Sequence, residues 1–149
     1  MKAVWQRVNE ARVEADNEIV GHIGKGALVL LGVESGDNDT DAAFIAEKCV
    51  NLRVFDDQNG RLNLSAADIG GGLLLVSQFT LCADCRKGRR PSFAKAADPD
   101  DAYRLYKLVA DMIRAKGIKI ETGRFQAYMK VHLVNDGPVT LLLDSRKGS

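Results

Sequence analysis

Two apolar runs in the sequence end abruptly in polar residues that could do chemistry. Leu73-Leu74-Leu75-Val76 is followed by Ser77-Gln78-Phe79-Thr80-Leu81, and Val131-His132-Leu133-Val134 is followed by Asn135-Asp136-Gly137-Pro138-Val139-Thr140. Polar groups that follow a buried strand sit on a rigid scaffold, where loops usually carry function. We therefore expect the two segments to contribute to one site.

The hydroxyls of Ser77 and Thr80 invite assignment as nucleophiles, but a hydroxyl needs an adjacent base to become reactive. The sequence offers two histidines for that role. His132 shares the polar face of its expected strand with Lys130, and His22 is expected in a turn between two glycines. Because the chain also lacks a Gly-x-Ser-x-Gly elbow, a side-chain triad is disfavoured. A strand that simply ends in turn-forming residues is the structural alternative.

Two further motifs have the residue spacing of known binding or redox sites, but the rest of the sequence does not support such a site at either. Cys82-Ala83-Asp84-Cys85 has the CxxC spacing of redox and metal sites, yet a zinc site needs about four ligands, and Cys49 has no paired ligand nearby. We predict incidental thiols and no metal. Gly70-Gly71-Gly72 precedes its strand and lacks the Gly-Lys-Ser/Thr ending of a phosphate loop, so it is predicted to be a turn.

A basic run directly follows the first polar segment and consists of Arg86, Lys87, Arg89 and Arg90. A formal net charge of +1 gives the whole chain no attraction to polyanions, so any nucleic-acid contact must come from a local patch. Such a run is usually a solvated loop. Here it is well placed to hold phosphates by charge, independent of base sequence.

Composition indicates one globular domain over residues 1–149, with a frayed tail from about residue 145. The chain is 46% hydrophobic, enough for a sizeable core, and shows no repeat. An odd number of cysteines and an early charge in place of a signal peptide indicate a reducing cytoplasm. No apolar stretch is long enough to span a bilayer, so no membrane partner is expected.

The N-terminal half of the sequence predicts a hairpin, a buried strand and a helix. The hairpin turns at Asp16-Asn17, and the apolar run 27–33 reads as a strand that is buried on both faces. Thr40 is the expected cap of a helix on which Ile45, Cys49 and Leu52 recur at helical spacing.

The C-terminal half predicts a second helix and a long strand. Asp98 is the expected N-cap with Pro99 at the first helical position, and Gly117 ends the helix. Around residues 129–133 apolar and polar residues alternate, as in a strand with one buried face. The order β-β-β-α-β-β-α-β-β predicts an α/β fold with a mixed, mostly antiparallel sheet and two main helices on one side.

The chain resembles the D-aminoacyl-tRNA deacylases, because both polar segments match the signatures of that family. Three other segments match in order and spacing: Gln6-Arg7-Val8, Arg90-Pro91-Ser92-Phe93 and Thr122-Gly123-Arg124-Phe125. The resemblance covers essentially the whole chain. It implies a compact three-layer α/β/β fold, a homodimer, tRNA as the partner, no DNA partner and no cofactor.

The resemblance also implies a reaction, the hydrolysis of the ester between tRNA and a D-amino acid or glycine, the latter mischarged on tRNA(Ala). Backbone N–H groups around Phe79 and Thr80 would stabilise the oxyanion, while Ser77 and Gln78 orient the ribose and the ester. The 2′-hydroxyl of the tRNA would be the catalytic group, which explains the missing base.

The resemblance also implies which residues further along the chain select the substrate. Phe125 and Met129 match positions that contact the terminal adenosine, although ordinary core packing is their alternative role. The segment from Asn135 carries the chirality filter, Gly137-Pro138, which would reach into the partner subunit's site with a cis peptide bond. Arg7 would brace that loop.

Two other classes of function remain open from the sequence alone. One is a hydrolase of small esters or amides that uses Thr80 as its nucleophile, which covalent trapping would reveal. The other is a non-catalytic tRNA-binding module, which would bind the acceptor stem without cleaving the ester.

Overall fold

Strand β1 (Lys2–Ala15) organises the sheet because it pairs with three antiparallel partners. In the computed structural model, which describes residues 1–147, its first half pairs with β3 (Gly26–Gly32) and its second half with β2 (Glu18–Ile23). Strand β8 (Lys130–Asp144) runs along the opposite edge of β1. Asp16 and Asn17, both with positive φ, make the predicted turn between β1 and β2.

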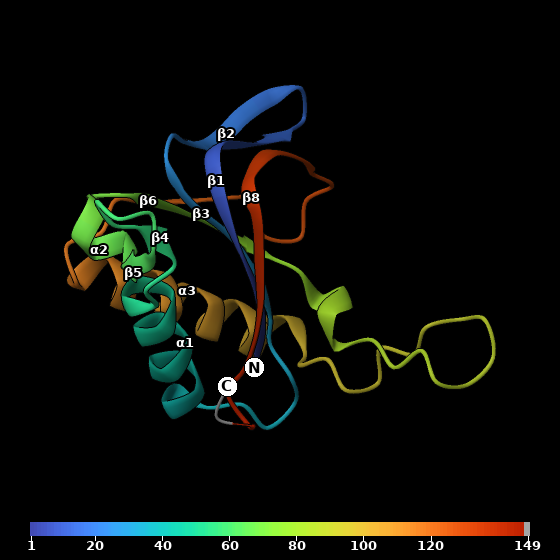
Figure 1. The fold of residues 1–149 in the computed structure, drawn as a ribbon. Coiled ribbons are helices and arrows are strands. Elements are labelled where there is room, and N and C mark those ends of the chain that lie inside the picture. The colour runs from blue at the N-terminus through green and yellow to red at the C-terminus, as the bar shows by residue number, and fades with distance from the viewer. Residues whose placement is uncertain (148–149) are drawn as a thin grey trace.

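Two parallel pairings extend the sheet beyond β3. β6 (Gly72–Ser77) pairs with β3, and β7 (Ile120–Thr122) pairs with β6. The connections contain α1 (Asp39–Asn51) and α3 (Pro99–Ala115), which lie together on one side of the sheet (Figure 1). The predicted mixed sheet with two main helices is therefore confirmed.

Four short elements complete the chain. β4 (Phe55–Asp56) and β5 (Leu62–Leu64) form a separate hairpin, and α2 (Ala66–Ile69) leads from it into β6. The 3-10 helix η1 (Phe79–Cys82) follows β6. The expected order has two strands between the main helices, where the structure has β4, β5 and β6, and it does not include α2. Segments this short carry too little periodicity to be recognised in the sequence. None of the helices in the described part of the chain is long and apolar enough to cross a membrane.

The core lies on both faces of β6. Leu73 and Leu75 belong to the larger hydrophobic cluster beneath the helices, while Leu74 and Val76 belong to a smaller cluster on the other face. Successive side chains of a strand point to opposite faces, so an unbroken apolar run fits a strand that is covered twice. β3 is covered in the same way, as its sequence predicts.

The two main helices begin at polar caps, one of which differs from the expectation. The side chain of Asn38 accepts hydrogen bonds from the N–H groups of Thr40 and Asp41, and the carboxylate of Asp41 accepts one from the Asn38 N–H. Thr40 as the cap is therefore wrong, because the reciprocal pair of Asn38 and Asp41 satisfies the free amides from a cap two residues earlier. Asp98 caps α3 as predicted, with Pro99 at its first position.

His22 also differs from the expectation. It lies in β2, opposite Arg12 of β1, and is not in a turn. Gly21 favours the strand here because it lets β2 approach the backbone of β7 closely: a Cβ at Gly21 would lie 2.5 Å from the carbonyl oxygen of Thr122.

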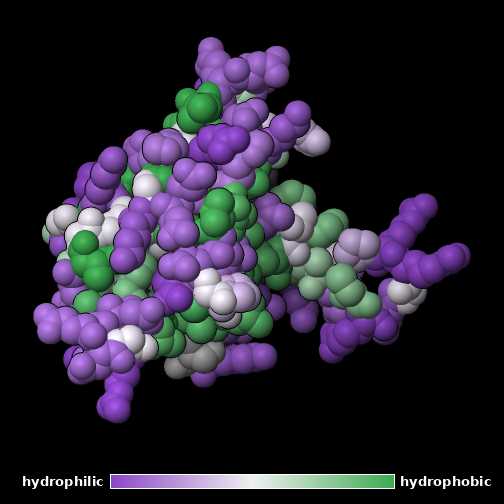
Figure 2. Space-filling model, turned by 45° about the horizontal axis from the view of Figure 1, so that its top comes forward, coloured by the Kyte–Doolittle hydropathy of each residue, from purple (hydrophilic) through white to green (hydrophobic). Residues whose placement is uncertain are grey.

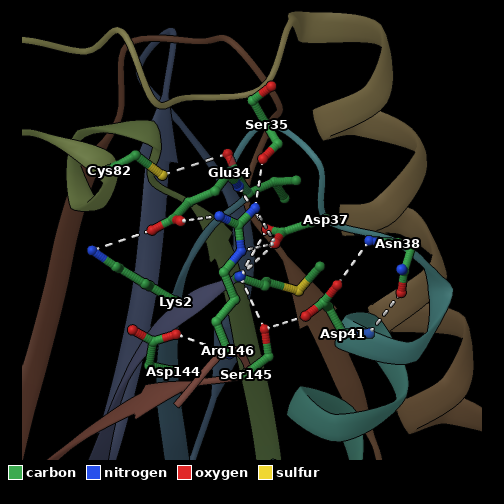
Figure 3. A network of polar contacts seen from close by, with 12 residues as sticks. Lys2, Glu34, Ser35, Asp37, Asn38, Asp41, Cys82, Asp144, Ser145 and Arg146 are labelled. Carbon is green, nitrogen blue, oxygen red and sulfur yellow. Dashed lines mark hydrogen bonds and ion pairs between the residues drawn. The ribbon is translucent and has the colours of Figure 1, made fainter.

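A polar network ties both ends of the described chain to the loop between β3 and α1 (Figure 3). The ammonium group of Met1 lies 2.8 Å from Asp37, whose side chain is fully buried. Ser145 accepts a hydrogen bond from that ammonium group, and Arg146 pairs with Asp37 and Glu34. Several partners converge on the buried carboxylate because an unpaired buried charge is costly.

The expected frayed tail is therefore wrong for Ser145 and Arg146. The Ser145 hydroxyl donates to Asp41 of α1, and Arg146 pairs with Glu34 of the β3–α1 loop. The last two residues of the expected tail, 148 and 149, lie outside the described part of the chain.

The close approach at Gly21 predicts a difference between two neighbouring glycines. We expect Gly21→Ala to destabilise the protein by about 1–3 kcal/mol, because the added methyl group meets backbone that cannot rotate away. Gly24→Ala is the matched control, since a Cβ there meets nothing within 4 Å, and should change stability by less than about 1 kcal/mol. Urea unfolding of both variants measures this, and equal midpoints would contradict it.

Candidate active site

A cavity of about 450 Å³ opens where β3, β6 and β7 end. Val33 follows β3, Ser77 to Phe79 come at the end of β6, and Phe125 to Met129 follow β7. The three ends meet because the parallel registers align Leu31 with Ser77 and Leu75 with Thr122. In α/β sheets, ligands bind outside the carboxyl ends of the strands, so this is the position expected for a site.

The segment after β6 presents free backbone donors at this cavity. The Gln78 N–H donates to the carbonyl of Leu31 at 2.7 Å, which pins the start of η1 to β3. The next two amides, those of Phe79 and Thr80, donate no hydrogen bond within residues 1–147. Amides in the first turn of a helix lack intrahelical partners, so both remain available to a ligand oxygen.

Side chains of the same segment are coupled to one another. The Gln78 amide donates to the Thr80 hydroxyl, and both residues are at least partly exposed. Gly32 makes this arrangement possible, because a Cβ there would lie 3.1 Å from the Gln78 carbonyl oxygen and 3.2 Å from the Cys82 sulfur. The glycine at the end of β3 therefore lets η1 pack closely against the sheet.

The wall after β7 is aromatic and apolar. The Phe125 ring lies 5.0 Å from the ring of Tyr103 and 5.8 Å from that of Tyr106. Burial raises the pKa of Tyr106 to about 12, and its hydroxyl donates to the Leu75 carbonyl at 2.9 Å, so this ring is a fixed, neutral support. Met129 packs beside Gly123, where a Cβ would lie 2.8 Å from its sulfur.

The lining of this cavity contains no ionisable side chain among the residues that the structure describes. Besides Ser77, Gln78, Phe79, Phe125 and Met129, which the sequence identified, the lining consists of small or neutral residues: Val33, Ala96, Ala97, Pro99, Ala102, Gln126 and Ala127. Thr80 lies next to the cavity without lining it. Alanines carry no chemical signal in a sequence, so only the start of α3 at Pro99 could have indicated this wall.

Both histidines lie elsewhere. They line a different cavity of about 380 Å³, in a cross-strand row with Arg12 that runs over β2, β1 and β8. His132 is half-buried, with Nε2 2.9 Å from a carboxylate oxygen of Glu14. Neither can act as a base for Ser77 or Thr80 in this arrangement, which agrees with the weak support for a triad.

The second polar segment forms a loop that interrupts β8. Asn135 pairs with Val8 and Thr140 with Gln6, so the residues between them bulge out of the strand. The Asn135 side chain bridges the base of the loop, accepting from the Val139 N–H at 2.7 Å and donating to Thr140 at 3.0 Å.

Arg7 holds this loop from below. It is almost completely buried and donates from Nε to the carbonyl of Asp136 at 2.8 Å and from Nη1 to the carbonyl of Val54 at 2.9 Å. The Gly137-Pro138 bond is cis, and Gly137 has a φ of 137°. The loop does not line this cavity, so the fold of the single chain does not bring the two polar segments together.

The basic run lies on a long loop that projects from the body of the molecule, and the tip of this loop is strongly hydrophilic (Figures 1 and 2). Arg86 is paired with Asp84 at 2.6 Å, which lowers the pKa of that carboxyl. Lys87, Arg89 and Arg90 are exposed. At the base of the loop, the ring of Phe93 packs edge-on against the ring of Phe79, which lines the cavity. The two ring centroids are 5.1 Å apart.

The two CxxC thiols point into different surroundings. Cys82 is buried, donates to the Val33 carbonyl at 3.4 Å, and has a pKa raised by burial. Cys85 is exposed. No group of three potential metal ligands occurs within residues 1–147, so nothing in this arrangement resembles a metal site.

Comparison with known proteins places this geometry in a family. The family model described as D-Tyr-tRNA(Tyr) deacylase matches residues 4–144. The chain belongs to this family. It is therefore an enzyme, a hydrolase of the deacylase class that acts on ester bonds.

Similar proteins cover the whole length of the chain. A D-aminoacyl-tRNA deacylase of Geobacter sulfurreducens is 60% identical over all 149 residues, which cover 98% of that protein. One of Thermosipho africanus is 57% identical over 147 residues and 99% of each chain.

Solved structures share the fold. The one titled "c-Myc DNA Unwinding Element Binding Protein" has a TM-score of 0.91 at 39% identity over 97% of this chain and 98% of that one. The one titled as a probable eukaryotic D-amino acid tRNA deacylase has a TM-score of 0.80 at 16% identity, over 95% and 97% of the two chains, and shows likeness of fold alone.

Proposed function

We propose that this chain hydrolyses the ester bond of D-aminoacyl-tRNA, releasing the free D-amino acid and tRNA, and so proofreads chirality in translation. The observation that carries the proposal is the cavity itself, which combines the free amide of Phe79, with that of Thr80 next to it, an aromatic wall and a lining without ionisable side chains. Such a site can position and polarise an activated ester, but it lacks its own base. We place its action in the cytoplasm, where aminoacyl-tRNA is used.

In the proposed reaction, water attacks the ester carbonyl and the bond from that carbon to the ribose oxygen breaks. The N–H groups of Phe79 and Thr80 donate to the oxyanion that forms, while Ser77 and Gln78 orient the ester and the ribose. The attacking water loses a proton to the vicinal 2′-hydroxyl of the terminal adenosine. That hydroxyl passes its own proton on to the departing ribose oxygen. The Thr80 hydroxyl, already engaged by Gln78, has no base beside it and is not the nucleophile.

The terminal adenosine binds at the Phe125 end of the cavity in this proposal. An apolar, aromatic wall suits an unstacked base, and Met129 completes it. The exposed basic residues Arg86, Lys87, Arg89 and Arg90 contact phosphates further along the tRNA, through charge and without reading bases.

Rejection of L-aminoacyl-tRNA is assigned to Gly137-Pro138 of a partner subunit. This loop is held in place by Arg7 and Asn135, and it lies outside the cavity of its own chain, so it is free to complete the cavity of another. Rigid backbone placed where an L side chain would project is a stronger filter than a fitted pocket, because one methylene group changes binding by only about 1–3 kcal/mol. Glycine, having no side chain to clash, would pass the filter.

A homodimer follows from this assignment. Within the described residues β8 pairs only with β1, which leaves a long open edge, and Leu142 on it is 77% exposed. Open edges of this length are normally covered.

We also propose three layers for each protomer. They are the helices, the strands β3, β6 and β7, and the β2 end of the sheet, which packs over the smaller hydrophobic cluster.

The substrate assignment predicts a specific pattern of cleavage. With purified protein, D-alanyl-tRNA and D-tyrosyl-tRNA should both be hydrolysed and their L counterparts spared, because rejection of L side chains does not depend on the size of D side chains. Glycyl-tRNA(Ala) should be cleaved at a rate nearer to the D than to the L substrates. Release of radiolabelled amino acid measures all five. Resistance of glycyl-tRNA under conditions that cleave D-alanyl-tRNA would refute rejection as the filter.

The catalytic assignment predicts opposite results for an enzyme change and a substrate change. Thr80→Ala should retain substantial activity, whereas a D-aminoacyl-tRNA whose terminal adenosine lacks the 2′-hydroxyl should react about 10²- to 10⁴-fold more slowly, the range for a lost proton-transfer group. Single-turnover rates separate the two. An inactive but folded Thr80→Ala, together with normal cleavage of the 2′-deoxy substrate, would make Thr80 the nucleophile.

The assembly assignment predicts that activity requires a dimer. Size-exclusion chromatography with light scattering should give twice the 16.2 kDa chain mass at assay concentrations. Introducing a lysine at exposed Leu142 should weaken self-association and lower D-aminoacyl-tRNA cleavage in parallel, while Leu62→Lys, exposed on the separate β5 hairpin, serves as the control. A fully active monomer would contradict the shared site.

A further inference from the structure

A second groove, of about 520 Å³, continues from the candidate site on the far side of Phe125. The Phe125 ring lines both cavities, so it forms the wall between them. Tyr103 lines the groove next to this ring, with the two centroids 5.0 Å apart, and is 46% exposed. The groove runs between α3 and the segment that follows β7, and no part of it is needed for the ester chemistry.

Three cationic side chains line the groove: Lys107 and Arg114 on α3, and Arg124 after β7. One acid, Asp111, faces them. Arg114 is paired with Asp111 at 2.9 Å and Arg124 with Asp16 at 2.9 Å, both in exposed positions. Exposed pairs of this kind contribute little energy, so both guanidinium groups can turn toward a stronger anion. Lys107 makes no ion pair among residues 1–147.

An exposed aromatic ring beside a row of cations is the arrangement that binds single-stranded nucleic acid. The ring stacks a base of any sequence, and the cations neutralise the phosphates on either side of it. A folded duplex would need a broader surface than this groove between one helix and one loop.

We propose that this groove binds the single-stranded nucleotides immediately 5′ of the terminal adenosine of the tRNA substrate. The inference rests on the proposed function and extends it. With the adenosine against Phe125 and Met129, the preceding nucleotides leave the pocket past that same ring. Tyr103 then stacks one of their bases, and Lys107, Arg114 and Arg124 hold their phosphates. The alternative exit passes Phe79 toward the basic run at residues 86–90.

The test compares a substrate that fills the groove with one that does not. D-Tyrosyl-tRNA carries the preceding nucleotides, whereas D-tyrosyl-adenosine ends at the pocket. Tyr103→Ala should raise the KM for D-tyrosyl-tRNA roughly five- to 150-fold, the range for loss of one stacked base. The rise in KM for D-tyrosyl-adenosine should be at least about fivefold smaller. Tyr103→Phe, which keeps the ring, should restore the low KM.

The cations are tested by the salt dependence of binding. Lys107→Gln/Arg114→Gln should lower the slope of log K against log salt by about 1.4, because each single-strand phosphate contributes about 0.7. Lys25→Gln/Arg61→Gln removes the same charge from two exposed residues outside the groove and should leave the slope unchanged. The probe is an RNA oligonucleotide that ends in CCA without an amino acid and carries a 5′ fluorophore, and its binding is followed by fluorescence anisotropy.

The outcomes separate this inference from the proposed function. Absence of D-tyrosyl ester cleavage by the wild type would refute the proposed function, while the oligonucleotide binding would still test the groove. Unchanged KM and salt slope in both groove variants, with weakening in a variant neutralised at residues 86–90, would overturn the groove in favour of the other exit. Equal losses on D-tyrosyl-tRNA and D-tyrosyl-adenosine would also overturn it, because Tyr103 would then act on the pocket itself.

Discussion

The parallel pairing of β3, β6 and β7 is the constraint on which the candidate site depends. β6 is buried on both faces, so a shift of register by one residue would exchange the two hydrophobic clusters and is strongly opposed. That fixed register brings Val33, Ser77 and the segment after Thr122 to one edge of the sheet. The cavity is therefore a consequence of how the core packs, and its walls inherit the rigidity of the strands behind them.

The neutral lining of the cavity limits the chemistry that it can support. Without an ionisable group, the site cannot activate a poor electrophile or generate a strong nucleophile by itself. It can hold an ester, exclude part of the water around it and offer two amides to a developing oxyanion. Such a site suits a substrate that is already activated and that brings a hydroxyl next to the scissile bond, which an aminoacyl ester of a ribose does.

The sequence predicts those parts of the fold that have strong local signals. The run Leu73 to Val76 and the pair Asp98-Pro99 were interpreted correctly because burial and capping act within a few residues. Thr40 and His22 were misplaced, since Asn38 offers a better reciprocal cap and the strand at His22 depends on a distant contact with Thr122. Five lining residues of the cavity could be identified in advance, but its alanine wall and the role of Gly32 depend on packing between distant segments.

In the function that we propose, recognition and chemistry are carried by different parts of this molecule. The two exposed loops each return to the scaffold through specific contacts: Phe93 on Phe79 for the basic loop, and Arg7 on Asp136 for the Gly137-Pro138 loop. Both anchors lie at the base of a loop, so the tips can vary in sequence without disturbing the strands behind the cavity. Because Arg7 is buried and satisfied by backbone carbonyls, truncating it would leave Asp136 and Val54 unpaired and would loosen the loop before it affected the core. In that proposal, selection among substrates can change while the amides of Phe79 and Thr80 stay in place, since the segment that carries them is held by the hydrogen bond from Gln78 to β3 and by its close packing on Gly32.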